Sequence, residues 1–175
     1  MKPRIAIDMD DVLADTTGKF IDLYRQHFDP AVAPERFREE SFHDLLDHDT
    51  YRRLSAYLYE PGFFRNLAVM PDAEEVTRAL SDRYELYVTT AAMQFRTSLV
   101  EKYDWLDEHF PHIPWQQRVF LGDKSIIRAE YMIDDMEYNL ETFQGEGLLF
   151  HAPHNQGDQR FRRVRSWQEV AGLLL

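Results

Sequence analysis

The 175-residue chain contains no cysteine and no long hydrophobic run. Without cysteine, the protein cannot build a disulfide framework, use a thiolate as a nucleophile or bind a metal through sulfur. No apolar stretch approaches the roughly 20 residues that a membrane-spanning helix needs, so the sequence predicts no transmembrane segment. A strand-like run begins almost at the N-terminus, and we therefore expect no signal peptide and a cytoplasmic protein.

Basic residues are outnumbered by acidic ones. Lys and Arg total 20 against 31 Asp and Glu, which gives a formal net charge of -11. This balance disfavours binding to a nucleic acid polymer, because such binding requires a basic surface. A small phosphorylated substrate remains compatible with it, since a metal ion and one lysine can reverse the local field.

The residues that are present are typical of a folded domain. Hydrophobic residues make up 44% of the chain and aromatic residues 14%. The length fits one domain with a sizeable core and room for a small insertion. We find no internal repeat and no low-complexity tract.

Short apolar runs alternate with segments of helical periodicity. We expect strands near residues 5–7, 86–89, 119–121, 131–133 and 148–150, and helices near residues 20–28, 42–59, 72–80, 95–110 and 166–174. This alternation indicates an α/β fold, a Rossmann-like parallel sheet flanked by helices on both faces. Asp72 and Ser166 are predicted N-caps, because each is followed three residues later by a glutamate.

The segment between the first two predicted strands contains only helical patterns, interrupted at Asp29-Pro30, Ala33-Pro34 and Glu60-Pro61-Gly62. We interpret residues 16–67 as a small all-helical cap inserted after the first strand. The core domain would then consist of residues 1–15 and 68–175.

Polar side chains with catalytic potential follow four of the predicted strands. They are Asp8 and Asp10 after the first strand, Thr89 and Thr90 at the end of the second, Lys124 shortly after the third, and Asp134 and Asp135 at the end of the fourth. Because the carboxyl ends of parallel strands meet at one edge of a sheet, we expect these residues to converge there. Carboxylates so close together repel each other unless a cation or a reacting group lies between them.

Such a group of residues can carry out phosphoryl transfer through a covalent aspartyl phosphate. Asp8, Asp135 and a backbone carbonyl near Asp10 would bind Mg²⁺ through the oxygen ligands that this ion prefers. With the phosphoryl charge neutralised, the Asp8 carboxylate can attack phosphorus. Asp10 would protonate the leaving oxygen and later deprotonate the attacking water.

The phosphoryl oxygens need further donors. The Thr90 hydroxyl and the Ala91 amide are the predicted partners, and the Lys124 ammonium adds a fixed positive charge. The choice between Thr89 and Thr90 stays open, although the end of the predicted strand favours Thr90.

Other polar residues have simpler interpretations. His151 and His154 show the spacing H-x-x-H, but no carboxylate or third histidine accompanies them locally, so we interpret them as part of a structural loop rather than a zinc site. A basic cluster near the C-terminus is interpreted as a solvated face or as ion pairs with acidic side chains. It consists of Arg160, Arg162, Arg163 and Arg165.

The set Asp-x-Asp, Thr, Lys and Asp-Asp resembles that of the haloacid-dehalogenase-like phosphohydrolases, and further motifs resemble one branch, the 5′(3′)-deoxyribonucleotidases. The matching segments are Asp8-Met9-Asp10-Asp11-Val12-Leu13-Ala14-Asp15, Tyr59-Glu60-Pro61-Gly62-Phe63-Phe64, Glu101-Lys102-Tyr103-Asp104-Trp105, Asp123-Lys124, Ile133-Asp134-Asp135 and His154-Asn155. The resemblance spans most of the chain.

This resemblance implies Mg²⁺-dependent dephosphorylation of (deoxy)nucleoside 5′- or 3′-monophosphates. It implies the roles already given for Asp8 and Asp10, and it implies that Asp8, the Asp10 carbonyl and Asp135 bind Mg²⁺. Asp134 would orient Lys124 or a metal-bound water. It also implies that aromatic residues of the insertion line a base pocket. Phe42 and Tyr59 are the best counterparts here, although they could simply belong to the core of the insertion.

The chain differs from the family pattern at two positions near the first motif. Asp11 stands where relatives often have glycine, and Thr16 stands where some have an aromatic residue. These differences bear on substrate identity more than on reaction type. The preferred base and sugar, the position of the ester and the oligomeric state, including a homodimer, stay open.

Three other functions share part of this pattern. A phosphatase with the same machinery could act on another small phosphate, such as a sugar phosphate. A phospho-receiver module also gathers acids, a threonine and a lysine at strand ends, but it places its phosphorylated aspartate on a middle strand and has no helical insertion. A catalytically inactive binding protein is disfavoured, because the full set of candidate residues is present.

Overall fold

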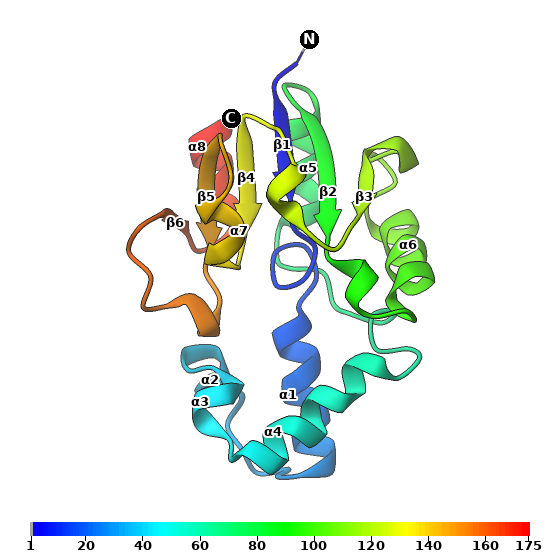
Figure 1. The fold of residues 1–175 in the computed structure, drawn as a ribbon, viewed down its shortest axis with the longest axis vertical. Helices are drawn as coiled ribbons and strands as arrows, with labels where there is room; N and C mark the ends of the chain where they lie inside the picture. The colour runs from blue at the N-terminus through cyan, green and yellow to red at the C-terminus, as the bar shows by residue number, and fades with distance from the viewer. Residues whose placement is uncertain (1) are drawn as a thin grey trace.

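In the computed structural model, which describes residues 2–175, six parallel strands form one sheet in the order β3-β2-β1-β4-β5-β6. The strands are β1 (Arg4–Ile7), β2 (Glu85–Thr90), β3 (Arg118–Phe120), β4 (Tyr131–Asp134), β5 (Glu146–Phe150) and β6 (Arg162–Val164). In the centre, Ile7 of β1 is in register with Val88 of β2 and Ile133 of β4. All carboxyl ends therefore lie at the same edge of the sheet, which faces α1 and α4 in Figure 1.

Helices occupy most of the remaining chain. The α-helices are α1 (Thr16–His27), α2 (Pro34–Glu39), α3 (Phe42–Leu45), α4 (His48–Ser55), α5 (Ala73–Ser81), α6 (Ser98–His109), α7 (Glu137–Glu141) and α8 (Trp167–Leu174). Short 3₁₀ helices are η1 (Ala56–Tyr59), η2 (Ala92–Gln94), η3 (Trp115–Gln117), η4 (Lys124–Ile126) and η5 (Pro153–Asn155). Among residues 2–175, no helix combines the length and the apolar character that crossing a membrane would require.

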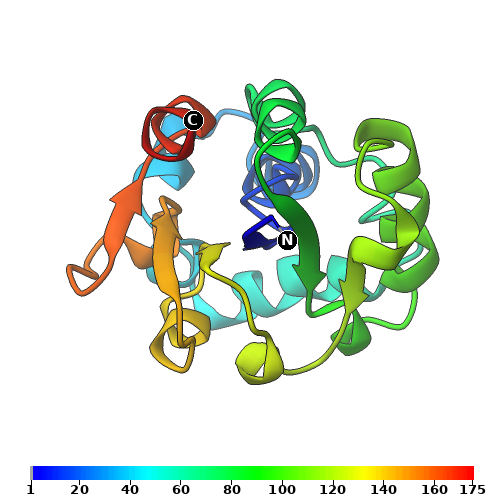
Figure 2. The same ribbon diagram turned by 90° about the horizontal axis from the view of Figure 1, so that it is seen from above.

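The two faces of the sheet are covered by different helices. Figure 2 shows α5 and α8 on one side of the sheet and α7 on the other. The alternation of side chains along β1 explains this arrangement, since Ile5 and Ile7 belong to the larger core while Ala6 packs with Met132 and Leu149 on the opposite face. Asp8 comes two residues after Ala6 and therefore points to the same face of the sheet. There it contacts Lys124 of η4.

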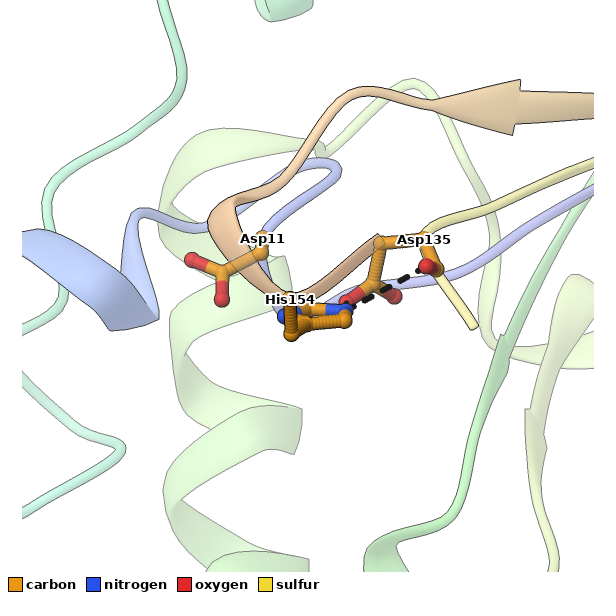
Figure 3. Close-up of side chains that lie close together, drawn as sticks. All are labelled: Asp11, Asp135 and His154. Atoms are coloured by element: carbon orange, nitrogen blue, oxygen red, sulfur yellow. Dashed lines mark hydrogen bonds and ion pairs between the residues drawn. The ribbon is translucent and has the colours of Figure 1, made fainter. Parts of the chain in front are cut away.

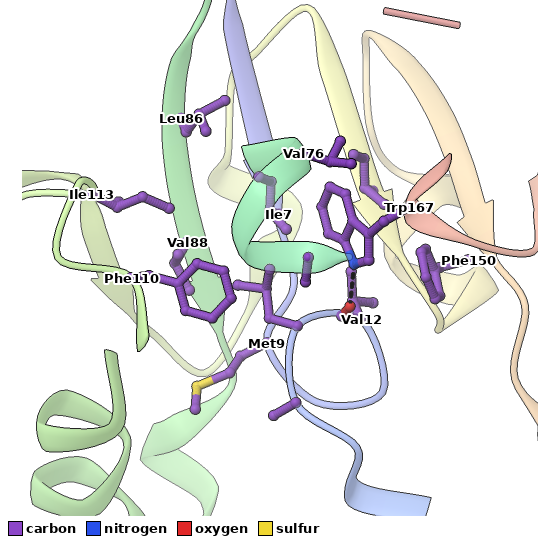
Figure 4. Close-up of a cluster of buried hydrophobic side chains, with 14 of the residues drawn as sticks. Ile7, Met9, Val12, Val76, Leu86, Val88, Phe110, Ile113, Phe150 and Trp167 are labelled. Carbon is purple, nitrogen blue, oxygen red and sulfur yellow. Dashed lines mark hydrogen bonds between the residues drawn. The ribbon is translucent and has the colours of Figure 1, made fainter. Parts of the chain in front are cut away.

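The larger core also supports the loop that follows β1. Trp167 of α8 is fully buried, and its indole Nε1 donates a hydrogen bond of 2.8 Å to the Val12 carbonyl (Figure 4). Met9 and Val12 are completely buried in the same cluster. The C-terminal helix therefore holds the segment that contains Asp10 and Asp11.

The predicted fold class is confirmed, but the strand β6 and the helices α2 and α7 were not predicted individually. The strand β6 lies at the edge of the sheet and consists of Arg162, Arg163 and Val164, which lack the apolar run of a buried strand. Helix α7 has only five residues, too few to show a helical period. The helix predicted over residues 42–59 is interrupted at Leu46, where the backbone becomes extended between α3 and α4.

Two local predictions need correction. Asp72 occupies the N-cap position of α5 as predicted, but its backbone is left-handed at φ 65° and its side chain makes no capping hydrogen bond. On α6, the sequence spacing of Leu99, Tyr103 and Leu106 predicts that these three residues share one side of the helix, yet Tyr103 is 42% exposed. The buried face instead carries Trp105 and Lys102. Ser166, by contrast, caps α8 as predicted, accepting a hydrogen bond from the Glu169 amide.

Glu101 joins the segment after η1 to the core. Its carboxylate on α6 accepts hydrogen bonds from the backbone amides of Gly62, at 2.5 Å, and Phe64, at 3.0 Å. Phe64 is buried, and Trp105, one turn after Glu101, donates to the Leu67 carbonyl at 2.9 Å. These contacts fix the return of the chain from the helices α1–α4 to the sheet.

We expect Glu101→Ala to lower the free energy of unfolding by about 1–3 kcal/mol, because it leaves two part-buried amides without their acceptor. Urea denaturation followed by circular dichroism measures the change. The matched control is Glu108→Ala on the same helix, whose ion pair with Arg65 lies at the surface and contributes less than about 1 kcal/mol. A loss no larger than that of the control would contradict the bridging role of Glu101.

Candidate functional site

Asp8, Lys124 and Asp134 form a buried charged group at the carboxyl edge of the sheet. The Lys124 ammonium donates to the Asp8 carboxylate and, at 2.6 Å, to Asp134 Oδ2. The second oxygen of Asp134 accepts hydrogen bonds from the Met136 amide and the Asn139 side chain, each at 3.0 Å. Asp134 is therefore fully occupied by donors of the protein.

Asp135 completes this group and leaves one oxygen free. Ligand atoms of Asp8, Asp134 and Asp135 all lie within 4.8 Å of one another. Asp135 is only 4% exposed, yet its Oδ1 has no hydrogen-bond partner. A buried carboxylate oxygen without a donor is costly unless a cation binds it. The three carboxylates and the free oxygen fit a hard divalent cation.

The charge balance of the group supports this conclusion. Burial raises the pKa of Asp8 well above its usual value, the charges of Asp134 and Asp135 add to the effect, and Lys124 opposes it. Burial would lower the pKa of Lys124, but Asp8 and Asp134 together raise it above its usual value. The single positive charge of Lys124 therefore faces three carboxylates. The excess negative charge favours a bound cation.

Asp10 and Thr90 meet at a second buried lysine. Lys102 of α6 is 1% exposed, and its ammonium donates to Asp10 and, at 2.9 Å, to the Thr90 hydroxyl. The same ammonium lies 4.6 Å from the centre of the Phe64 ring, within the range of a cation–π contact. Thr16 adds a hydrogen bond of 3.3 Å to the other oxygen of Asp10.

The two threonines at the end of β2 point in different directions. Thr89 Oγ1 lies 3.5 Å from the Ile7 carbonyl inside the sheet. Thr90, bonded to Lys102, lies on the side of Asp10. Residues of this edge line an open cleft of about 590 Å³, among them Asp8, Asp10, Ala91, Lys124 and Asp135.

The loop between β1 and α1 has a strained residue at Asp11. Its φ is 53°, in the left-handed region. Glycine adopts this conformation without steric cost, and aspartate adopts it more often than most other residues. The Asp11 carboxylate accepts from the Thr17 amide at 2.7 Å and the Thr17 hydroxyl at 2.9 Å. Burial and the charge of Asp135 raise the pKa of Asp11 to about 7, while the hydrogen bonds from Thr17 oppose the shift.

His154 lies between Asp11 and Asp135, as Figure 3 shows. Its Nε2 is 3.0 Å from Asp135 Oδ2. Burial would lower the pKa of His154, but the hydrogen bond to Asp135 and the charges of Asp135 and Asp11 raise it to about 9. The imidazole is therefore charged at neutral pH. The prediction that His154 is merely part of a structural loop overlooked this contact.

A second hollow adjoins the acidic group. It has a volume of about 300 Å³ and lies between α1, α3, α4 and the loop at His154. Phe42 lines it and stacks on Phe37 with the ring centres 4.4 Å apart. Tyr59 is 64% exposed and packs edge-on against Phe95, which lines the larger cleft.

No role was predicted for Lys102, Thr16 or Asn155. Lys102 had a detectable signal, since it shares a helix face with Trp105 and Leu106 at spacings of three and four residues. A lysine within such an apolar face needs a buried acidic partner. Asn155 and Thr16 show no comparable sequence signal, because only the tertiary fold brings them next to their hydrogen-bond partners.

The sequence matches a described protein family over residues 2–175. That family is the 5′ nucleotidase, deoxy (pyrimidine), cytosolic type C protein family, NT5C. A relative from Staphylococcus aureus (strain Mu50) is 46% identical over 175 residues, covering 99% of this chain and 96% of the relative. The 5′(3′)-deoxyribonucleotidase of Bacillus subtilis (strain 168) is 40% identical, and the match covers both chains completely.

Solved structures share the fold at low sequence identity. A haloacid dehalogenase-like hydrolase from Streptococcus pneumoniae superposes with a TM-score of 0.60 at 15% identity, covering 99% of both chains. The Bacillus subtilis protein YfnB, solved with bound magnesium, superposes with a TM-score of 0.61 at 14% identity, covering 99% of this chain and 98% of that one.

Proposed function

This chain belongs to the 5′(3′)-deoxyribonucleotidase family and has the haloacid-dehalogenase-like fold, and on that premise we propose that it is a Mg²⁺-dependent phosphatase of (deoxy)nucleoside monophosphates. The observation that carries the proposal is the convergence of Asp8, Asp10, Lys124 and Asp135 on one cleft. A nucleophile, an acid, a fixed cation and a carboxylate with a free oxygen are what phosphoryl transfer requires.

Asp8 is the proposed nucleophile. Its oxygen attacks phosphorus while the bond from phosphorus to the ester oxygen breaks, giving an aspartyl phosphate and the nucleoside. Asp10 supplies the proton that the leaving oxygen needs. It then accepts a proton from water, which attacks the same phosphorus, releases inorganic phosphate and restores the Asp8 carboxylate.

The other side chains of the cleft orient these groups. Lys124 holds one Asp8 oxygen and offers positive charge to the phosphoryl group. Lys102 fixes the Asp10 carboxylate and the Thr90 hydroxyl relative to each other. Thr90 and the Ala91 amide are the proposed donors to the phosphoryl oxygens, and Asp134 keeps Lys124 in place.

Asp8, Asp135 and the carbonyl of Asp10 would hold the Mg²⁺ ion. When bound, the ion neutralises negative charge on the carboxylates and on the phosphoryl oxygens. The free buried Oδ1 of Asp135 supports this assignment, because it has no donor from the protein.

We propose that residues 16–67 act as a cap on the core formed by residues 1–15 and 68–175. The helices α1–α4 lie over the carboxyl edge of the sheet, where they would shield the reaction from water (Figure 1). The hollow lined by Phe20, Phe42 and Leu58 is the proposed base site. Its largely apolar lining favours a flat nucleobase over the hydroxyl groups of a sugar phosphate.

Phosphate release from a panel of nucleoside and sugar monophosphates tests the proposal. We expect EDTA to abolish turnover, excess Mg²⁺ to restore it, and nucleoside monophosphates to be hydrolysed at least about tenfold faster than sugar phosphates, a difference of about 1.4 kcal/mol in transition-state binding. Turnover that survives EDTA would contradict the metal dependence. Equal or faster hydrolysis of sugar phosphates would contradict the substrate class.

A further inference from the structure

The segment His154-Asn155 contacts Asp135, although the two belong to loops that follow different strands. It forms the end of η5, after β5, whereas Asp135 follows β4. Asn155 is 2% exposed, and its Nδ2 donates to the Asp135 carbonyl and the Phe150 carbonyl, each at 2.7 Å. The backbone of Asp135 is thereby tied to the end of β5.

Asn155 is itself held on its other side. Its Oδ1 accepts from the Ala152 amide at 3.2 Å and from Arg163 Nη1 at 2.5 Å. Arg163 of β6 also donates to the carbonyls of Asn155 and Asp158, each at 2.8 Å. All hydrogen-bonding positions of the Asn155 amide are satisfied, so its orientation is fixed. Arg163, expected at a solvated face, instead organises this loop.

His154 fixes the Asp135 side chain. Its Nε2 lies 3.0 Å from Asp135 Oδ2 and 3.3 Å from the Asp135 carbonyl. Both oxygens accept, so Nε2 carries the proton. With Oδ2 held in this way, the rotation of the carboxylate is restricted, and Oδ1 is the oxygen left without a partner.

Asp11 lies on the opposite side of the imidazole. Ligand atoms of Asp11, His154 and Asp135 lie within 4.8 Å of one another, with the imidazole between the two acids in Figure 3. Asp11 is in turn held by Thr17 at the start of α1. The row from Thr17 to Asp135 thus links the helices α1–α4 to the acidic group.

We propose that His154 and Asn155 are positioning residues that hold Asp135 with its Oδ1 directed at the divalent cation. The inference rests on the proposed function in one respect, the assignment of Asp135 as a metal ligand. Partners that orient a ligating carboxylate typically change metal affinity 10- to 100-fold when they are lost. The effect falls on metal binding rather than on the reaction at saturating metal.

The test measures Mg²⁺ binding to the metal-free full chain by calorimetry and by the Mg²⁺-dependent rise of the melting temperature. The variants are His154→Ala, which removes the donor, and His154→Gln, whose amide can still donate to Asp135 Oδ2. The matched control is His151→Ala, on the same loop, whose ring contacts Arg163 at 3.4 Å. Activity is then recorded as a function of Mg²⁺ and of substrate.

We expect His154→Ala to weaken Mg²⁺ binding about 10- to 100-fold. His154→Gln should retain most of the affinity, and His151→Ala should match the unmodified protein. In assays, the activity lost by His154→Ala at low Mg²⁺ should return at high Mg²⁺.

Two outcomes would overturn the inference. The first is a lower melting temperature of metal-free His154→Ala with unchanged Mg²⁺ affinity, which indicates a structural role only. The second is a fall in Mg²⁺ stoichiometry from two ions to one, which makes His154 a ligand of a second cation. If the unmodified protein binds Mg²⁺ but hydrolyses no phosphomonoester, the proposed function fails while the positioning role can still hold.

Discussion

Asp8→Asn is expected to reduce phosphate release from a nucleoside monophosphate on the order of 10⁶-fold, as removal of a catalytic nucleophile does elsewhere. Asparagine has the same shape and can still accept the hydrogen bond from Lys124, but its amide cannot attack phosphorus. Because burial disfavours the charged form of Asp8, removing that charge should not lower the melting temperature. Initial rates at saturating Mg²⁺ and a thermal melt measure the two effects.

The matched control is Asp104→Asn, which removes the same charge from the exposed surface of α6. It should leave the rate within about twofold of the unmodified enzyme, since a distant surface charge contributes little. Near-normal turnover by Asp8→Asn would remove Asp8 from the mechanism. Loss of turnover with a collapsed melting temperature would assign Asp8 a structural role instead.

Asp10→Asn is expected to slow turnover of a nucleotide roughly 10²- to 10⁴-fold, the contribution of a general acid. The loss should be much smaller for p-nitrophenyl phosphate, whose leaving group departs without a proton. Asparagine can still accept from Lys102 through its amide oxygen, while its NH2 group can donate to the Thr16 hydroxyl, so the geometry around Thr90 is preserved.

The ratio of the two rates is the decisive measurement for Asp10. A variant that loses the same factor on both substrates has lost something other than proton donation to the leaving oxygen. In that case Asp10 would act by orienting Lys102 and Thr90, and another group must protonate the nucleoside.

The convergence of Asp8, Lys124 and Asp135 could be predicted because it follows from topology. Parallel strands bring their carboxyl ends to one edge, and short apolar runs locate those strands without any knowledge of packing. The same reasoning failed at β6, where an edge strand shows charged side chains to solvent and leaves no apolar signal.

Lys102 and His154 were missed for different physical reasons. Lysine is usually a surface residue, so the position of Lys102 on the same helix face as Trp105 was not taken as a sign of burial. The sequence spacing instead placed Tyr103 on the side of Leu106, although Tyr103 is exposed. The partner of His154 is not one of its neighbours in the sequence. Its partner Asp135 lies 19 residues away and is brought close only by the pairing of β4 with β5.

The hydrogen bond between Trp167 and Val12 joins residues that are 155 positions apart. A ribosome adding about 5–20 residues per second needs roughly 8–30 s to pass from one to the other. During that interval the nascent chain already contains Asp8 and Asp10, but Trp167, which supports the loop after β1, has not yet been synthesised. The segment that contains Asp10 and Asp11 therefore gains this support late in translation, when nearly the whole polypeptide has been synthesised.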